Sequence, residues 1–158
     1  MRYIFMILAF VGIDQWIKYL VRVHLTSKSF VEVIPNFIHL THQENKGISF
    51  SMLDGLPENI RVPLLSGISF VVIVGLCVYI WRNWPDLNSR EKWGFSLILS
   101  GAIGNLLDRA VRKQVTDYMI FHFFETSFFV NNLADDLISI GFMLILWQSF
   151  TKKDVKQK

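Results

Sequence analysis

Long apolar runs separated by short polar stretches dominate the hydrophobic pattern of the chain. A helix needs about 20 mostly apolar residues to cross the hydrocarbon layer of a membrane. Four segments come close to that length, and only the second carries no charge. They run over residues 3–23, 62–81, 93–111 and 133–150. The pattern predicts an all-α membrane protein, with four transmembrane helices in a single domain over residues 1–158.

The stretch between the first two spans has a different pattern. Apolar and polar residues alternate in "FVEVI" and in "FIHLTH", and turn residues follow each run, Pro35-Asn36 and then Asn45-Lys46-Gly47. Such alternation is typical of short strands. We therefore expect a small extracytoplasmic β-sheet between the first two helices. Residues 112–132 are rich in Phe, and we expect them to lie at interfacial depth.

Composition and charge support the membrane class. The chain is 52% hydrophobic and 18% charged, with a net charge of +3. The basic tail "TKKDVKQK" directly follows an apolar segment, which indicates a membrane-surface anchor, and no nucleic-acid partner is expected. Cys77 lies in an apolar run and has no partner cysteine. His39 and His42 lack the HExxH spacing, so we expect no metal site and no cofactor.

Four spans would place both termini on one side of the membrane. Each side would then carry eight basic residues. Lys18 and Arg109 lie within spans, and discounting them favours cytoplasmic termini. In that orientation, the polar residues of the first, third and fourth spans lie towards the extracytoplasmic face.

Ionisable residues inside membrane spans mark functional sites by default. Asp14 and Lys18 are one helical turn apart, which suits an ion pair. Asp117 follows the third span inside an apolar stretch, where a carboxyl is poorly solvated. The fourth span begins with Asp135 and Asp136. The pattern predicts that these polar groups converge at one level.

Two neighbouring carboxyl groups that share a proton can act as base and acid in the attack of water on an amide. Asn amides and an Arg could orient the substrate and stabilise an oxyanion. The residue types leave alternatives open: a small proton-coupled transporter or a non-catalytic membrane scaffold. Asp14–Lys18 could be purely structural, Asn132 or an acid after it could cap the fourth helix, and Asp108 could be an ordinary interfacial charge.

Five sequence blocks, in order, resemble the bacterial lipoprotein signal peptidase family (signal peptidase II). They are "DQWIK", "ENKGISFSML", "GAIGNLLDR", "VTDYM" and "NNLAD", and they extend over essentially the whole chain. The resemblance implies that Asp117 and Asp135 are the catalytic aspartates. It implies substrate-binding or supporting roles for Asp14, Lys18, Asn45, Gly47, Asn105, Arg109 and Asn132.

The resemblance also implies the activity. Members are aspartic endopeptidases without metal or cofactor, and they remove the signal peptide of prolipoproteins before a cysteine that carries a diacylglyceryl group. We therefore expect a lipid-modified prolipoprotein and membrane lipid as partners, and a monomer. The expected location is the bacterial inner membrane, with both termini cytoplasmic and the active site near the extracytoplasmic face. The strand region around Gly47 and residues 118–130 are expected to clamp the substrate.

The chain departs from the family pattern next to the second aspartate. Asn131 stands where Phe is usual, and Asp136 stands where a small or hydroxylated residue is usual. Neighbouring helical residues point about 100° apart, so only one of two adjacent acids can face Asp117. The motif register favours Asp135. We expect Asp136 to cap the helix or to meet a cation such as Arg112.

Overall fold

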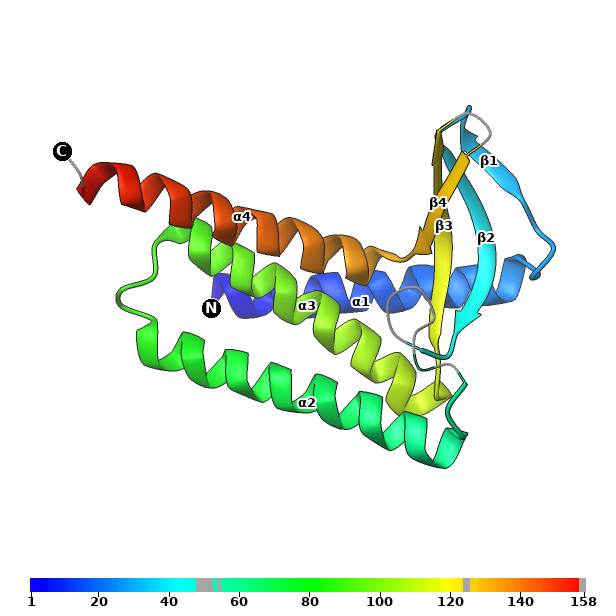
Figure 1. Cartoon of the computed structure of the whole chain (residues 1–158), viewed down its shortest axis with the longest axis horizontal. Coiled ribbons are helices and arrows are strands. Elements are labelled where there is room, and N and C mark those ends of the chain that lie inside the picture. Colours follow the sequence, from blue (N-terminus) through cyan, green and yellow to red (C-terminus); the bar gives the residue numbers. More distant parts are fainter. Residues whose placement is uncertain (48–52, 54, 124–125, 157–158) are drawn as a thin grey trace.

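Four long helices end at a small sheet in the structure of this chain, a computed structural model (Figure 1). The structure describes residues 1–47, 53, 55–123 and 126–156. The helices are α1 (Arg2–His24), α2 (Glu58–Asn83), α3 (Ser89–Arg112) and α4 (Leu133–Lys156). All four predicted helical segments are confirmed as helices. Each helix is longer than its apolar run because polar residues extend it, at both ends of α1, α2 and α3 and at the C-terminal end of α4.

The sheet has four antiparallel strands in the order β1-β2-β3-β4. The strands are β1 (Val31–Ile34), β2 (Ile38–Asn45), β3 (Val115–Phe123) and β4 (Thr126–Asn131). The first two confirm the predicted strands, and the turn between them holds Asn36 at a φ of 58°, a left-handed conformation that Asn tolerates.

The sheet predicted between the first two helices is present there, but it is larger than expected. β3 and β4 come from the Phe-rich segment between α3 and α4, and β3 pairs with β2 over residues 38–45. The aromatic and β-branched residues of this segment favour strands. Pairing with β3 also satisfies the backbone groups along one edge of β2, which would otherwise be left open.

Three helices are long and apolar enough to cross a membrane among the residues that the structure describes: α1, α2 and residues 133–151 of α4. The predicted crossing by α3 is not confirmed and stays a prediction. α3 packs most extensively against α4 and also against α1 and α2. A helix that is surrounded by protein can carry polar residues such as Asn105 and Asp108, since they meet protein rather than lipid.

Glycines bring α3 and α4 into backbone contact. A Cβ added at Gly101 would clash with the carbonyl oxygen of Ala134, and one added at Gly94 would lie 2.8 Å from the carbonyl oxygen of Gly141. Small residues permit such close approach of helices. The contact fixes the depth at which the first turn of α4 lies beside α3.

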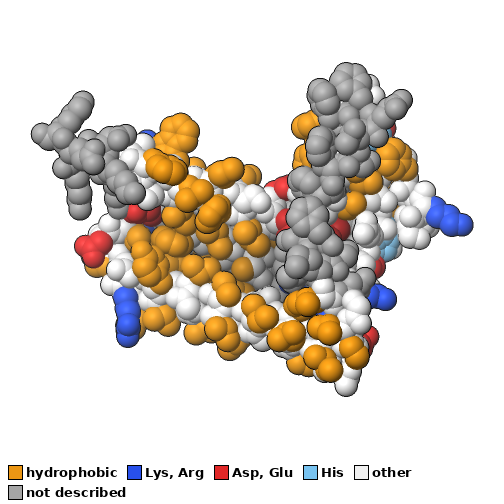
Figure 2. Space-filling view, viewed as in Figure 1, with side chains coloured by type: hydrophobic (Ala, Val, Ile, Leu, Met, Phe, Trp, Pro, Cys, Tyr) orange, Lys and Arg blue, Asp and Glu red, His pale blue; other side chains and the backbone are white. Residues whose placement is uncertain are grey.

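The sheet lies at one end of the helices, and both termini and the α2–α3 connection lie at the other end (Figure 1). The C-terminal ends of α1 and α3 and the N-terminal ends of α2 and α4 meet at the sheet. Hydrophobic side chains cover much of the helical surface (Figure 2). The polar residues singled out in the sequence therefore lie at the junction of helices and sheet.

Candidate active site

A buried lysine joins α1 to α3. The Lys18 ammonium lies 2.9 Å from Asp14 Oδ2 and 2.8 Å from Asp108 Oδ2, and all three side chains are fully buried. Lys18 Nζ also donates a hydrogen bond of 2.9 Å to Asn105 Oδ1. A buried charge requires such partners, because its desolvation is costly.

Asp108 is part of this network, so its interpretation as an ordinary interfacial charge does not hold. The spacing contained the missed signal, since residues three apart on a helix are neighbours. Asp108 is three positions after Asn105, and both contact Lys18.

Asp135 lies at the end of the same network. Asn105 Nδ2 donates a hydrogen bond of 2.8 Å to Asp135 Oδ1. Because the ammonium of Lys18 occupies Asn105 Oδ1, the amide N–H of Asn105 is held towards the carboxylate. If the Asn105 amide were flipped, its oxygen would face the carboxylate of Asp135, and its N–H donors would face the ammonium of Lys18. The orientation of this amide is therefore set by a residue of α1.

Asp117 lies on β3 between two other amides. Asn45 Nδ2 donates to Asp117 Oδ2 at 2.9 Å, and Asn132 Nδ2 donates to Asp117 Oδ1 at 2.6 Å. The side chain is only 3% exposed. The pKa of Asp117 is raised to about 6, mainly by burial and also by the charge of Asp135, while the two amide hydrogen bonds act in the opposite direction. This carboxyl group is thus able to gain and lose a proton close to neutral pH.

A single side chain, Asn132, contacts the segments that carry both aspartates. Its amide nitrogen donates to Asp117, and its Oδ1 accepts a hydrogen bond of 3.1 Å from the backbone N–H of Asp135. Asn132 is fully buried. It therefore caps α4, as one of the sequence alternatives held, and at the same time holds Asp117.

Other elements complete the cap of α4. The first N–H groups of a helix have no partner within the helix. Here Leu133 N–H donates to the hydroxyl of Tyr118 at 3.1 Å, and Ala134 N–H donates to Asp14 Oδ1 at 3.1 Å. Side chains from β3 and α1 thus fix the turn that carries Asp135. Asp14 has this capping role in addition to its ion pair.

Arg109 and Gly47 connect the site to the end of β2. Arg109 donates to the carbonyl oxygen of Gly47 at 3.3 Å, and its positive charge interacts with Asp117 and Asp135. Gly47 N–H donates to Asn45 Oδ1 at 2.9 Å, which directs the amide nitrogen of Asn45 towards Asp117. Residues 48–52 of the expected clamp lie outside the described residues.

The two adjacent acids of α4 have different neighbours. Asp135 Oδ1 accepts a hydrogen bond of 2.8 Å from Asn105 Nδ2, whereas Asp136 Oδ1 accepts one of 2.6 Å from Asn131 Nδ2. The expected contact of Asp136 with Arg112 was wrong, because Arg112 pairs with Glu44 at 3.2 Å.

The histidines of β2 contact residues of the sheet and of its connection to α1. His39 stacks on Phe30 with ring centroids 4.1 Å apart, and His42 lies between the Leu25 carbonyl and the Glu44 carboxylate. No three His, Cys, Asp or Glu side chains within the described part of the chain gather closely enough to hold a metal ion.

Comparisons with known proteins cover nearly the whole chain. A family model described as signal peptidase (SPase) II matches residues 6–151. The chain is 36% identical over 145 residues to a lipoprotein signal peptidase of Mesorhizobium japonicum, covering 92% of this chain and 83% of that protein. It is 36% identical over 149 residues to the lipoprotein signal peptidase of Brucella ovis, covering 93% and 88%.

Two solved bacterial membrane enzymes have similar folds. The first has a TM-score of 0.85 and 27% identity, covering 99% of this chain and 92% of that chain. The second has a TM-score of 0.80 and 27% identity, covering 93% and 91%.

Proposed function

This chain belongs to the signal peptidase II family, and from that premise we propose that it removes the signal peptide from prolipoproteins. The proposed substrate carries a diacylglyceryl group on a cysteine, and the amide bond before that cysteine is hydrolysed. One observation carries the proposal at the level of the site. Asn132 hydrogen-bonds Asp117 through its amide nitrogen and the Asp135 backbone through its oxygen, so two acids from separate segments belong to one assembly.

Asp117 and Asp135 act as a catalytic dyad that shares one proton. The ionised member removes a proton from water, whose oxygen attacks the scissile carbonyl carbon, while the protonated member donates its proton to the carbonyl oxygen. The tetrahedral intermediate then breaks its C–N bond, and a dyad carboxyl supplies the proton that the leaving amine takes up. A pKa of about 6 for Asp117 suits this exchange, because the proton affinity lies near the working pH.

The neighbouring groups support the dyad. Asn45 and Asn132 hold Asp117, and Asn105 holds Asp135, so each carboxylate presents a defined oxygen to the water. Arg109 supplies positive charge beside both acids, which favours the oxyanion that forms during attack. Three further residues act through these groups. Lys18 acts through Asn105, Asp14 acts through the cap of α4, and Gly47 acts through Asn45.

The orientation in the membrane is part of the proposal. The site lies at the sheet end of the helices, and both termini lie at the opposite end (Figure 1). With cytoplasmic termini, the dyad lies near the extracytoplasmic face, at the depth where lipid gives way to water. A substrate anchored by its acyl chains and its apolar signal peptide reaches that depth by lateral diffusion. Exposed apolar side chains on α1, α2 and α4 suit direct contact with lipid.

The test is cleavage by the purified protein in detergent micelles. A synthetic precursor peptide with a diacylglyceryl cysteine is incubated with the protein, and the shortened product is detected by mass spectrometry. The expected result is one cut, directly before the modified cysteine. The same peptide without the lipid is the matched control and is expected to remain uncut. An intact lipidated peptide would contradict the proposal and favour a scaffold, and Asp117-dependent proton flux in liposomes would favour a transporter.

A further inference from the structure

Asn131 and Asp136 form a second polar pair next to the dyad. Asn131 ends β4 and is 7% exposed, and its amide nitrogen donates to Asp136 Oδ1 at 2.6 Å. The amide oxygen of Asn131 is buried and receives no hydrogen bond within the part of the chain that the structure describes. Asp136 is half-buried. The pair therefore contains a buried acceptor for which these residues supply no donor.

The position of the pair follows from the register of the sheet. Asn131 is paired with Met119 of β3, and Met119 is two residues after Asp117. Side chains two apart on a strand share a face, and directly paired residues share a face across strands. Asn131 thus lies on the face of the sheet that carries Asp117. Asn132, which holds Asp117, is the next residue along the chain.

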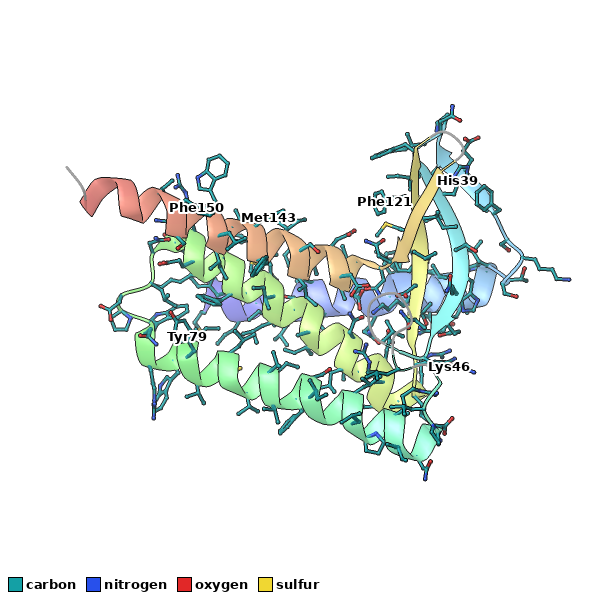
Figure 3. The ribbon with its side chains drawn as sticks, viewed as in Figure 1. His39, Lys46, Tyr79, Phe121, Met143 and Phe150 are labelled. Carbon is teal, nitrogen blue, oxygen red and sulfur yellow. The ribbon has the colours of Figure 1, made fainter. Side chains whose placement is uncertain are left out.

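Asp136 lies at the start of the outward-facing side of α4. Helical spacing places Ile140, Met143 and Trp147 on the same side of the helix, and all three are exposed. Figure 3 shows Met143 on α4 and Phe121 on the sheet beyond the first turn of that helix. Figure 2 shows a hollow between the helices and the projecting sheet, with acidic side chains visible in it. A substrate moving along the lipid-facing side of α4 would therefore meet Asp136 close to the dyad.

The hydrogen-bonding groups of Asn131 and Asp136 determine which ligands can bind to the pair. An ionised carboxylate and an amide oxygen both accept hydrogen bonds, and the amide N–H of Asn131 is already used by Asp136. A buried acceptor without a donor is unfavourable, and a ligand that brings a donor relieves that cost. The matching groups are ammonium, guanidinium, hydroxyl and amide N–H, and a cation gains most because it also stabilises the ionised form of the Asp136 carboxyl group.

The two members of the pair contact each other directly, at 2.6 Å. Asn131 adjoins Asn132 and Asp136 adjoins Asp135 in the chain, so the pair lies beside both segments of the proposed dyad.

We propose that Asn131 and Asp136 form a substrate subsite that binds a hydrogen-bond donor, above all a Lys or Arg side chain, located within a few residues of the scissile bond. The proposal rests on the proposed peptidase function and adds to it a preference for substrates with a Lys or Arg side chain near the scissile bond. The short separation follows from chain connectivity, since each member of the pair is the immediate neighbour of a residue that holds or forms the dyad.

The experiment compares diacylglyceryl peptides that differ at one position. Lys, Ser, Ala or Glu is placed in turn at each of the three positions before the scissile bond and at each of the three positions after the modified cysteine, and kcat and KM are measured. The wild-type protein is expected to prefer Lys to Ala by about tenfold in kcat/KM at one position, the size of one hydrogen bond to a charged group. The preference is expected in KM, because the contact exists before the reaction and persists through it.

Two variants test the residues. In D136N the carboxylate charge is lost while the shape is retained, so the Lys-to-Ala ratio is expected to fall close to one. N131F/D136S removes both members of the pair and is expected to lose the ratio as well. Thermal unfolding of each variant in the same micelles checks that the fold is retained. A ratio that is absent in the wild-type protein, or that persists in D136N, overturns the subsite.

Lipid headgroups offer the same chemistry as a lysine, so the assay is run with and without phosphatidylethanolamine in the micelles. A Lys-to-Ala ratio that is the same in both supports a peptide ligand. A ratio that disappears when ethanolamine headgroups are added, together with D136N-sensitive activation by that lipid, overturns the peptide assignment in favour of a headgroup. Failure of the wild-type protein to cut any peptide overturns the proposed function and this proposal together, whereas cleavage without a Lys preference overturns the subsite alone.

Discussion

Asp117 and Asp135, the two acids at the centre of the site, both carry a carboxyl group, but different kinds of partner hold them in place. Asp117 extends from a strand and contacts two neutral amides, from Asn45 and Asn132. Asp135 lies in the first turn of a helix and contacts the amide of Asn105, which is itself held by the buried ammonium of Lys18. One acid is held by side chains near the sheet, and the other by a network that begins in α1.

Because their surroundings differ, the two carboxyl groups of this one site depend on different interactions. No ion pair to Asp117 occurs among the residues that the structure describes, and burial is the main cause that raises its pKa, to about 6. Asp135 depends instead on a charged network that must be complete, because a buried ion pair that loses one partner leaves an uncompensated charge. A substitution that removes the Lys18 ammonium from α1 should therefore disturb Asp135 through Asn105, and it should affect Asp117 less.

The largest effect is expected from changing either acid of the proposed dyad. D117N and D135N each remove the group that carries or accepts the shared proton, so cleavage is expected to fall on the order of a thousandfold or more. The measurement is product formation from the lipidated peptide, with folding checked by circular dichroism. E58Q changes an exposed acid on α2 and is the control, expected to cleave normally. Activity in the double variant D117N/D135N would refute the dyad.

Removing the ammonium of Lys18 tests the network on the Asp135 side. K18M leaves Asp14 and Asp108 buried without their cation, so stability is expected to fall by about 3–5 kcal/mol. Cleavage is also expected to fall, since nothing then fixes the amide of Asn105. The thermal unfolding midpoint and kcat are measured in the same micelles.

The matched control for this change is K113M, which removes an exposed lysine paired with Glu58 at 2.6 Å. Exposed pairs contribute less than about 1 kcal/mol, so the control should barely change the midpoint. In K18M/D108N one of the two acids is neutralised, and part of the lost stability should return while cleavage stays low. Equal midpoints for K18M and K113M would contradict the described network.

The pH dependence of stability tests the Asp117 side. The pKa of Asp117 in the folded protein, about 6, lies above its ordinary value of 3.8. Between these values the folded state binds more protons than the unfolded state, so this group makes stability fall as pH rises. The difference amounts to roughly 3 kcal/mol across the window. Unfolding midpoints from pH 4 to pH 7 should therefore decline more steeply in the wild-type protein than in D117N, and parallel curves would contradict the assigned pKa.

The smallest effect is expected at the cap of α4. Y118F removes the hydroxyl that accepts the Leu133 N–H, at a cost of about 1 kcal/mol in stability. Y79F alters an exposed tyrosine on α2 and is the control. The midpoint should fall in Y118F only, and an unchanged midpoint there would show that the cap does not contribute.

The helices and the motif residues could be predicted from the sequence because their signals are local. Runs of apolar side chains favour helices in lipid, and spacing along a helix places Asp14 above Lys18. β3 and β4 were missed as strands because their apolar residues do not alternate cleanly with polar ones, and aromatic richness also suits an interfacial segment. Asp108 was left among the alternatives because the cation that neutralises it lies on another helix.

The order of residues along the chain fixes which segments are apolar, where the acids stand and which motif each acid belongs to. The partners of those acids depend on how the helices and strands pack. Asp14 caps α4 from 120 positions away, and Lys18 sets the amide that faces Asp135 through Asn105, 87 positions away. The physical reason is that burying a charge or a free N–H is costly, so each must meet a partner. That partner is chosen by which helices and strands pack together, not by proximity along the chain.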